Sequence, residues 1–211
     1  MITVIDYGSG NLRSVAKALE SVGGRVRVSQ DEADLRQATH LVLPGVGAFA
    51  DCHRNLTASR LLPPMLTHIQ AGKPFLGICV GMQLLFTEGR EFGTHPGLDL
   101  IPGHVTRFAT TMPDPEDAGR HLKVPHMGWN PLQQTRPHPL WRDIPDGAHF
   151  YYVHSFHACP ADETVVVGHS QYGLPFTAAV ARDNLFATQF HPEKSQRHGL
   201  CLLQHFVDWR P

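Results

Sequence analysis

The sequence has 211 residues, of which 42% are hydrophobic and 18% are charged, and its formal net charge is −1. This length is typical of one domain, and the apolar fraction is sufficient for a full core. The balanced charge disfavours nucleic acids and anionic membranes as partners, and no apolar run approaches the length of a transmembrane helix.

The first half of the chain alternates predicted strands and helices. Apolar runs bounded by turn residues predict strands at residues 2–6, 26–29, 40–43 and 74–78. Helical spacing of apolar residues predicts helices at 11–22 and 31–38, and a helical stretch within 49–71 that breaks at Pro63-Pro64. Repeated β–α units predict an α/β fold with a mostly parallel central sheet and flanking helices, whose ligands bind beyond the carboxyl ends of the strands.

The second half has a different pattern. Strands are predicted at residues 103–108, 148–156, 164–170, 176–182 and 185–190. Their close spacing predicts antiparallel strands added to the sheet in the C-terminal half. Residues 110–121 are polar and proline-rich, which indicates an exposed loop, and a last helix is predicted at 198–209. No linker divides the chain, so one domain is expected over residues 1–211.

The cysteines are widely separated, at positions 52, 79, 159 and 201, and form no C-x-x-C pair. This spacing predicts free thiols rather than a disulfide framework. The first residues also lack the pattern of a secretory signal peptide. The sequence therefore predicts a protein of the reducing cytoplasm.

One cysteine lies on a turn that favours reactivity. The segment Gly77-Ile78-Cys79-Val80-Gly81 joins the strand at 74–78 to a helix-compatible run at 82–86, and it matches a nucleophile elbow with cysteine in the place of serine. Glycines are required there because a Cβ would press on a neighbouring backbone. Cys79 would then lie at a helix N-terminus, which favours the thiolate. The alternative is a buried structural cysteine between two ordinary glycines.

A histidine and a carboxylate follow the predicted strand at 185–190, in the segment His191-Pro192-Glu193. In an extended segment, residues two apart point to the same side, so His191 and Glu193 are predicted to face one pocket. A thiol nucleophile needs a base, and that base needs an orienting acceptor. The alternative is that His191 is simply one of fifteen histidines and Glu193 is a surface charge.

A third element has the composition of an oxyanion loop. Pro44-Gly45-Val46-Gly47 follows the predicted strand at 40–43. Acyl transfer through a tetrahedral intermediate needs N–H donors aimed at the developing oxyanion, and a glycine-bearing loop can supply one. The N–H of Val80 is the usual second donor in such elbows. An ordinary glycine-rich turn would have the same sequence.

Together these elements resemble the class I glutamine amidotransferases. Within that family, four stretches resemble the glutaminase subunits of imidazole glycerol phosphate synthases: DYGSGNLRSV at 6–15, VPHMGWN at 124–130, YYVHS at 151–155 and QFHPEKS at 189–195. The resemblance covers essentially the whole chain, and VPHMGWN is its most specific part.

The resemblance implies a single amidotransferase domain that hydrolyses L-glutamine to glutamate and ammonia through a cysteine thioester, with no cofactor or metal. It further implies a heterodimer with a cyclase subunit, which receives the ammonia and makes imidazole glycerol phosphate and AICAR in histidine biosynthesis. By the same resemblance, Cys79 is the nucleophile, His191 the base and then acid, and Glu193 the orienting group.

The remaining site residues also come from the resemblance. Gly47 and Val80 belong to the oxyanion hole. The glutamine α-amino and α-carboxylate groups are held by Gln83, Glu91, His154 and Ser155. The partner interface includes Asn11, Met127, Trp129 and Tyr151.

Three other functions fit parts of the sequence. A glutaminase of another synthetase, such as that for anthranilate or guanylate, would share the chemistry, but VPHMGWN argues against it. A free-standing thiol hydrolase or γ-glutamyl peptidase would act without a partner. A metal-binding protein is suggested by the run of His154, His157 and Cys159. However, strand positions three apart face opposite sides, and no four-ligand spacing is present.

Overall fold

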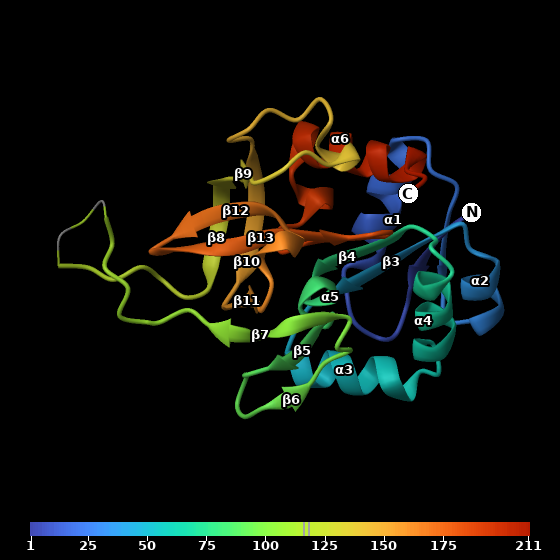
Figure 1. Ribbon diagram of the computed structural model, residues 1–211, viewed down its shortest axis with the longest axis horizontal. Coiled ribbons are helices and arrows are strands. Elements are labelled where there is room, and N and C mark those ends of the chain that lie inside the picture. The colour runs from blue at the N-terminus through green and yellow to red at the C-terminus, as the bar shows by residue number, and fades with distance from the viewer. Residues whose placement is uncertain (116, 118) are drawn as a thin grey trace.

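The computed structural model describes residues 1–115, 117 and 119–211. In the described part of the chain, twelve strands form one large sheet and two strands form a smaller sheet beside it. Helices flank the large sheet in its N-terminal half, whereas the C-terminal half is built mainly from strands (Figure 1). The structure is therefore a mixed α/β fold.

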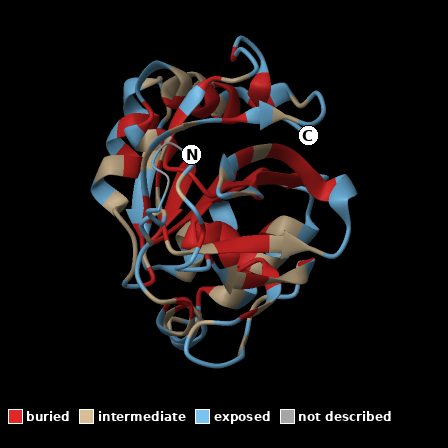
Figure 2. Ribbon diagram, turned by 90° about the vertical axis from the view of Figure 1, so that its left-hand side faces the viewer, coloured by how far each residue is buried: buried red, intermediate tan, exposed pale blue. Residues whose placement is uncertain are grey.

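Five neighbouring strands of the large sheet run parallel. Their order is β2 (Val26–Ser29), β1 (Ile2–Ile5), β3 (His40–Gly45), β4 (Phe75–Cys79) and β14 (Leu185–Thr188). Every residue of the four inner strands is buried, as expected for a sheet covered on both faces. Figure 2 shows the buried residues along these central strands and the exposed ones in the outer loops. The predicted parallel sheet is confirmed.

The helices follow the predicted order along the chain. They are α1 (Leu12–Ser21), α2 (Glu32–Gln37), α3 (Phe49–Ala58), α4 (Leu62–Gln70) and α6 (Gln196–Asp208). In Figure 1, α1 and α6 pack together on one side of the parallel strands and α3 lies on the other.

The break within 49–71 was predicted at the wrong place. It falls at residues 59–61, and Pro63 and Pro64 instead lie in the first turn of α4. Proline is tolerated there because the first N–H groups of a helix have no intrahelical acceptor.

Antiparallel strands extend the sheet in the C-terminal half, as predicted. Next to β14 come β13 (Leu174–Arg182), β11 (Phe156–Pro160), β7 (Ile101–Arg107), β5 (Phe86–Gly89) and β6 (His95–Pro96). β12 (Val166–Tyr172) also pairs with β13, and β9 (Gln133–Gln134) pairs with β12. All of these contacts are antiparallel except that between β5 and β7.

The predicted strand at 148–156 is in fact two strands in two sheets. β10 (His149–His154) pairs with β8 (His126–Pro131) in the small sheet, while β11 joins the large one. Ser155 lies between them. No glycine or proline marks this boundary, so the sequence from Phe150 to Phe156 resembles one strand.

The helix expected at 82–86 is also different. The helix after the elbow is a single turn, α5 (Val80–Gln83), and β5 begins at Phe86. Leu84, Leu85 and Phe86 are completely buried, and periodicity alone does not distinguish a helix from a strand in such a run.

The loop predicted at 110–121 includes Glu116 and Ala118, which lie outside the described residues. Most of its described residues are exposed, and they extend away from the sheet (Figure 1). Met112 is an exception with 6% exposure, because its side chain packs against Gly173.

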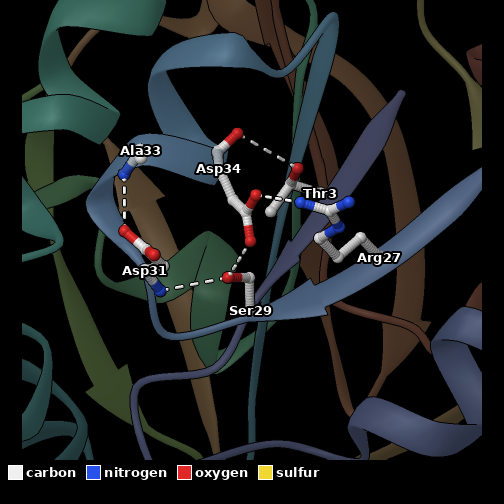
Figure 3. Close-up of polar contacts among 6 residues, drawn as sticks. All are labelled: Thr3, Arg27, Ser29, Asp31, Ala33 and Asp34. Atoms are coloured by element: carbon white, nitrogen blue, oxygen red, sulfur yellow. Dashed lines mark hydrogen bonds and ion pairs between the residues drawn. The ribbon is translucent and has the colours of Figure 1, made fainter.

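The turn from β2 into α2 is held by side-chain hydrogen bonds at the outer edge of the sheet (Figure 3). Asp31 accepts the backbone N–H of Ala33 at 2.8 Å and so caps α2. Ser29 donates to the Asp34 carboxylate at 2.6 Å, and Arg27 pairs with the same carboxylate.

Among the described residues, none of the helices has the length and hydropathy of a membrane-spanning helix.

Candidate active site

A cavity of about 300 Å³ lies where β3, β4 and β14 end. Its walls come from segments far apart in the sequence: Val46, Gly47, Cys79, Val80, Gln83, Glu91, Pro125, Val153, His154, Ser155, Phe156, His191 and Lys194. The cavity therefore lies at the carboxyl ends of parallel strands, where α/β sheets bind their ligands.

Cys79 lies on the tight turn that the sequence predicted. Its φ is 55°, an unusual value for a residue with a side chain. A Cβ on Gly81 would come within 1.9 Å of the Leu43 carbonyl oxygen, and one on Gly77 would meet the Gly81 oxygen at 2.9 Å. The turn therefore holds Cys79 in a strained conformation at the cavity wall, as expected of a nucleophile elbow.

His191 and Glu193 form a buried hydrogen-bonded pair. The His191 Nδ1 atom lies 2.9 Å from Glu193 Oε1, and the side chains are 2% and 1% exposed. The segment is not extended as predicted, because Pro192–Lys194 forms a 3₁₀ turn closed by the Lys194 N–H to the His191 carbonyl. Proline favours the first turn of a helix, so the two side chains meet through a turn rather than through alternation along a strand.

The environment of His191 favours its charged form. Burial lowers the pKa of His191, but the neighbouring Cys79 sulfur and the Glu193 carboxylate together outweigh burial and raise it to about 10. The other ring nitrogen, Nε2, is buried and makes no hydrogen bond with any described residue. It is therefore free to exchange a proton with the sulfur or with a molecule in the cavity.

Gln83 and Glu91 line the same cavity. Gln83 is the last residue of α5, and Glu91 follows β5. Gln83 donates from Nε2 to the Gln189 side-chain oxygen at 3.0 Å and to the Phe156 carbonyl at 3.2 Å. Glu91 accepts the backbone N–H of Phe49 at 2.7 Å. The structure thus places these two of the four predicted substrate-binding residues in one cavity with Cys79.

His154 lines the cavity, but both of its ring nitrogens already have partners. Nδ1 lies 2.8 Å from the Phe156 carbonyl oxygen and Nε2 lies 3.0 Å from His126 Nδ1. Burial lowers the pKa of His154 to about 3, so the ring is neutral. Its ring nitrogens are not available to a ligand, whereas the neighbouring Ser155 is half-buried on the cavity wall.

The residues predicted at a partner interface lie outside the cavity. Met127 and Trp129 are 62% and 46% exposed on β8. Trp129 contacts Tyr151 across the small sheet, with ring centroids 6.0 Å apart. Asn11 precedes α1, next to Gly10, which packs against Pro44 of β3.

Two polar residues near Cys79 were not predicted from the sequence. Gln189 is completely buried and donates from Nε2 to the Cys79 sulfur at 3.7 Å. Lys194 lines the cavity and lies 5.9 Å above the Tyr151 ring. Both belong to the QFHPEKS stretch, which was the only signal for them.

The histidine and cysteine run at 154–159 does not converge. The His157 ring stacks on Phe108 with centroids 4.6 Å apart, and its Nδ1 atom lies 3.8 Å from the Cys159 sulfur. Among the residues that the structure describes, no group of three or more histidine, cysteine, aspartate or glutamate side chains is arranged to hold a metal ion.

Comparison with known proteins agrees with the family resemblance of the sequence. The family model "Glutamine amidotransferase class-I" matches residues 3–208. The imidazole glycerol phosphate synthase subunit HisH of Syntrophotalea carbinolica is 54% identical over 208 residues, which cover 99% of this chain and 100% of the relative. The protein of the same name from Geobacter metallireducens is 55% identical over 206 residues, 98% of this chain and 97% of the relative.

Solved structures show the same fold at low sequence identity. A glutamine amidotransferase structure has a TM-score of 0.73 and 18% identity, covering 98% of this chain and 97% of its own. The PurLQS structure from Thermotoga maritima matches with the same TM-score, identity and coverage.

Proposed function

This chain belongs to the class I glutamine amidotransferase family, and on that premise we propose that it is the glutaminase subunit of an imidazole glycerol phosphate synthase. The observation that carries the glutaminase assignment is the buried His191–Glu193 pair, in which His191 keeps an unpaired Nε2 atom and lines the same cavity as Cys79. The names of relatives that are 54% and 55% identical over nearly the whole chain support the choice of synthase.

The first chemical step is attack on the side-chain amide of L-glutamine. The Cys79 thiolate adds to the carboxamide carbon, and the C=O electron pair moves onto oxygen. The N–H groups of Val80 and Gly47 are the proposed donors to that oxyanion, since both residues line the cavity. Protonated His191 then gives its Nε2 proton to the departing nitrogen, the C–N bond breaks, and ammonia leaves behind a thioester.

The second step releases glutamate. His191, now neutral, takes a proton from water, and the resulting hydroxide adds to the thioester carbon. The C–S bond breaks and the thiolate of Cys79 is restored. Glu193 accepts from Nδ1 throughout, which holds the ring orientation and stabilises the imidazolium.

Substrate recognition uses the polar ends of glutamine. Glu91 and Gln83 are the proposed acceptors for the α-ammonium group, and Ser155 is the proposed donor to the α-carboxylate. His154 supports this wall by its hydrogen bonds to Phe156 and His126 rather than by binding the substrate through its ring. A site that pairs these groups rejects simple amides, because its own polar atoms would be left unpaired.

The partner is a cyclase subunit that receives the ammonia and makes imidazole glycerol phosphate and AICAR. The proposed contact surface of the heterodimer is centred on the exposed side chains of Met127 and Trp129. It also includes Tyr151, which contacts Trp129, and Asn11, which lies near β3. Exposed Trp and Met at one site are typical of interface anchors.

The test is Cys79→Ala in the assembled synthase. Glutamine-dependent synthesis should fall by at least about 10³-fold, while synthesis driven by added ammonium salt should persist. Cys159→Ala is the matched control, since Cys159 lies outside the cavity and should leave both activities unchanged. Retained glutamine-dependent synthesis in Cys79→Ala would refute the assignment, as would loss of both activities in a folded, assembled variant.

Two alternative functions predict different results in a glutamate-release assay. A free-standing thiol hydrolase would hydrolyse glutamine equally fast with and without the cyclase. A glutaminase of another synthetase would not bind this cyclase, but would be activated by its own synthetase subunit. Glutamate release measured with each candidate partner separates these outcomes.

A further inference from the structure

The helix that was expected to favour the thiolate of Cys79 ends before the predicted run at 82–86 does. The helix after Cys79 is only the four residues Val80–Gln83, so its dipole is small. A thiolate at this buried position, where Cys79 is 5% exposed, needs other hydrogen-bond donors. One such donor is present, and it comes from the end of the neighbouring parallel strand.

Gln189, the residue directly after β14, supplies that donor. Its side chain is fully buried, and its Nε2 atom lies 3.7 Å from the Cys79 sulfur. Its oxygen accepts a hydrogen bond from Gln83 Nε2 at 3.0 Å. Gln83 Nε2 also donates to the Phe156 carbonyl at 3.2 Å. The three side chains therefore form one chain of amide hydrogen bonds that begins at the sulfur.

When the sulfur is ionised, the hydrogen bonds that join Cys79, Gln189 and Gln83 can be donated in only one direction. A thiolate can only accept, so Gln189 must turn its NH₂ group toward Cys79 and its oxygen toward Gln83. Gln83 must then present its NH₂ group to Gln189, and its two N–H bonds are both used, by Gln189 and by Phe156. The Gln83 oxygen remains, and it can only accept a hydrogen bond.

We propose that Gln189 holds the Cys79 sulfur as a hydrogen-bond donor and, through Gln83, fixes an acceptor for the α-ammonium group of the substrate. In the second of these roles Gln189 is a positioning residue. The inference rests on the proposed function for the identity of the substrate, but the contact with the sulfur does not depend on it. Ionisation of the nucleophile and selection of an amino-acid substrate are thereby linked by one buried amide.

The first test needs no glutaminase activity. In the full chain, alkylation of Cys79 by iodoacetamide is followed by peptide mass spectrometry across pH 5–9. Gln189→Met keeps the size of the side chain but has no donor, so alkylation at pH 7 should slow about tenfold and the profile should move to higher pH. Gln189→Glu places a carboxylate against the sulfur and should slow alkylation further.

The other cysteines are internal controls in the same samples. Cys159 and Cys201 are half-buried and lie outside the cavity, so their alkylation rates should change less than about twofold if the variants are folded. An unchanged Cys79 profile in a variant that passes this control would overturn the donor role.

The second test addresses substrate selection in the assembled synthase. It compares L-glutamine with 4-carbamoylbutyrate, which has the same amide and carboxylate but no α-ammonium group. Wild-type enzyme should strongly prefer glutamine, and Gln189→Met should reduce that preference about tenfold, mainly by raising KM for glutamine. An unchanged preference would overturn the positioning role. If the alkylation rates change as expected but the wild-type complex hydrolyses no glutamine, the proposed function is refuted and the contact between Gln189 and the sulfur still stands.

Discussion

The Glu91 carboxylate accepts the backbone N–H of Phe49 at 2.7 Å, so a residue of the cavity wall also caps α3. The residue at the N-cap of α3 is Ala48, whose side chain makes no capping hydrogen bond. Glu91 takes over that role from another segment, and its negative charge is favourable at a helix N-terminus. Because α3 follows directly after Val46 and Gly47, the same contact fixes one end of the proposed oxyanion loop.

This dual role predicts separable effects of two substitutions. Glu91→Ala should lower the free energy of unfolding by about 1–2 kcal/mol, because the Phe49 N–H loses its acceptor, and should raise KM for glutamine. Glu91→Gln keeps an acceptor oxygen, so it should recover most of the stability while KM stays high. Urea unfolding and steady-state glutaminase kinetics measure the two effects. Equal stability of both variants would contradict the capping role.

A second prediction concerns the charge on Glu193. Glu193→Gln removes the carboxylate that helps to raise the pKa of His191, so that pKa should fall. The imidazolium is the proposed acid for ammonia release, so the alkaline limb of the pH–rate profile should move to lower pH. The value of kcat should drop about 10²-fold or more, because an amide orients the ring less well. A profile that keeps its alkaline limb in this variant would argue against His191 as the acid.

The parts of the fold that the sequence predicts well are the ones with local signals. The strands from Ile2 to Cys79 alternate with amphipathic helices, and a buried parallel strand is a short apolar run of clear length. The elbow was equally visible, because the close approach of Gly81 to Leu43 excludes any larger residue. The pairing of His191 with Glu193 was foreseen from spacing, although the turn that achieves it was not.

The remaining features depend on contacts between distant segments. Gln189 directly follows β14 and has no local signal of its own, and only the neighbouring β4 and α5 show that it meets Cys79 and Gln83. The ring of His154 forms a hydrogen bond with His126, which lies on a strand 28 residues earlier. The split of 148–156 between two sheets likewise follows from pairing with β8 and β7, which no local pattern reports.

The exposed tryptophan gives a prediction about assembly. Trp129→Ala should weaken binding to the cyclase at least about 30-fold, since an exposed indole next to Met127 fits an interface anchor. Val28→Ala is a control, because Val28 is 40% exposed on β2, an edge strand of the large sheet, whereas Trp129 lies on β8 of the small sheet. Isothermal titration with the cyclase measures both, and a normal affinity for Trp129→Ala would place the interface elsewhere.

Four buried histidines predict a loss of stability in acid. Burial lowers the pKa of His40, His68 and His126 to about 4, and that of His154 to about 3. The unfolded chain takes up these protons near pH 6.5, whereas the folded chain resists them until the pH approaches the lower values. The folded state is therefore favoured above pH 6.5 and loses that advantage as the pH falls from 6.5 toward 4.

Near pH 5, each histidine should contribute a slope of about 1.4 kcal/mol of unfolding free energy per pH unit. The four together should give a slope of about 5 kcal/mol per pH unit. His68→Gln can keep a donor to the Pro74 carbonyl, which His68 contacts at 3.1 Å, so it should reduce the slope by about 1.4 kcal/mol per pH unit. His149→Gln changes an exposed histidine and should leave the slope as it is. Urea unfolding between pH 7 and 4.5 measures all three proteins. A wild-type stability that stays flat over that range would mean that protons reach these four side chains without opening the core.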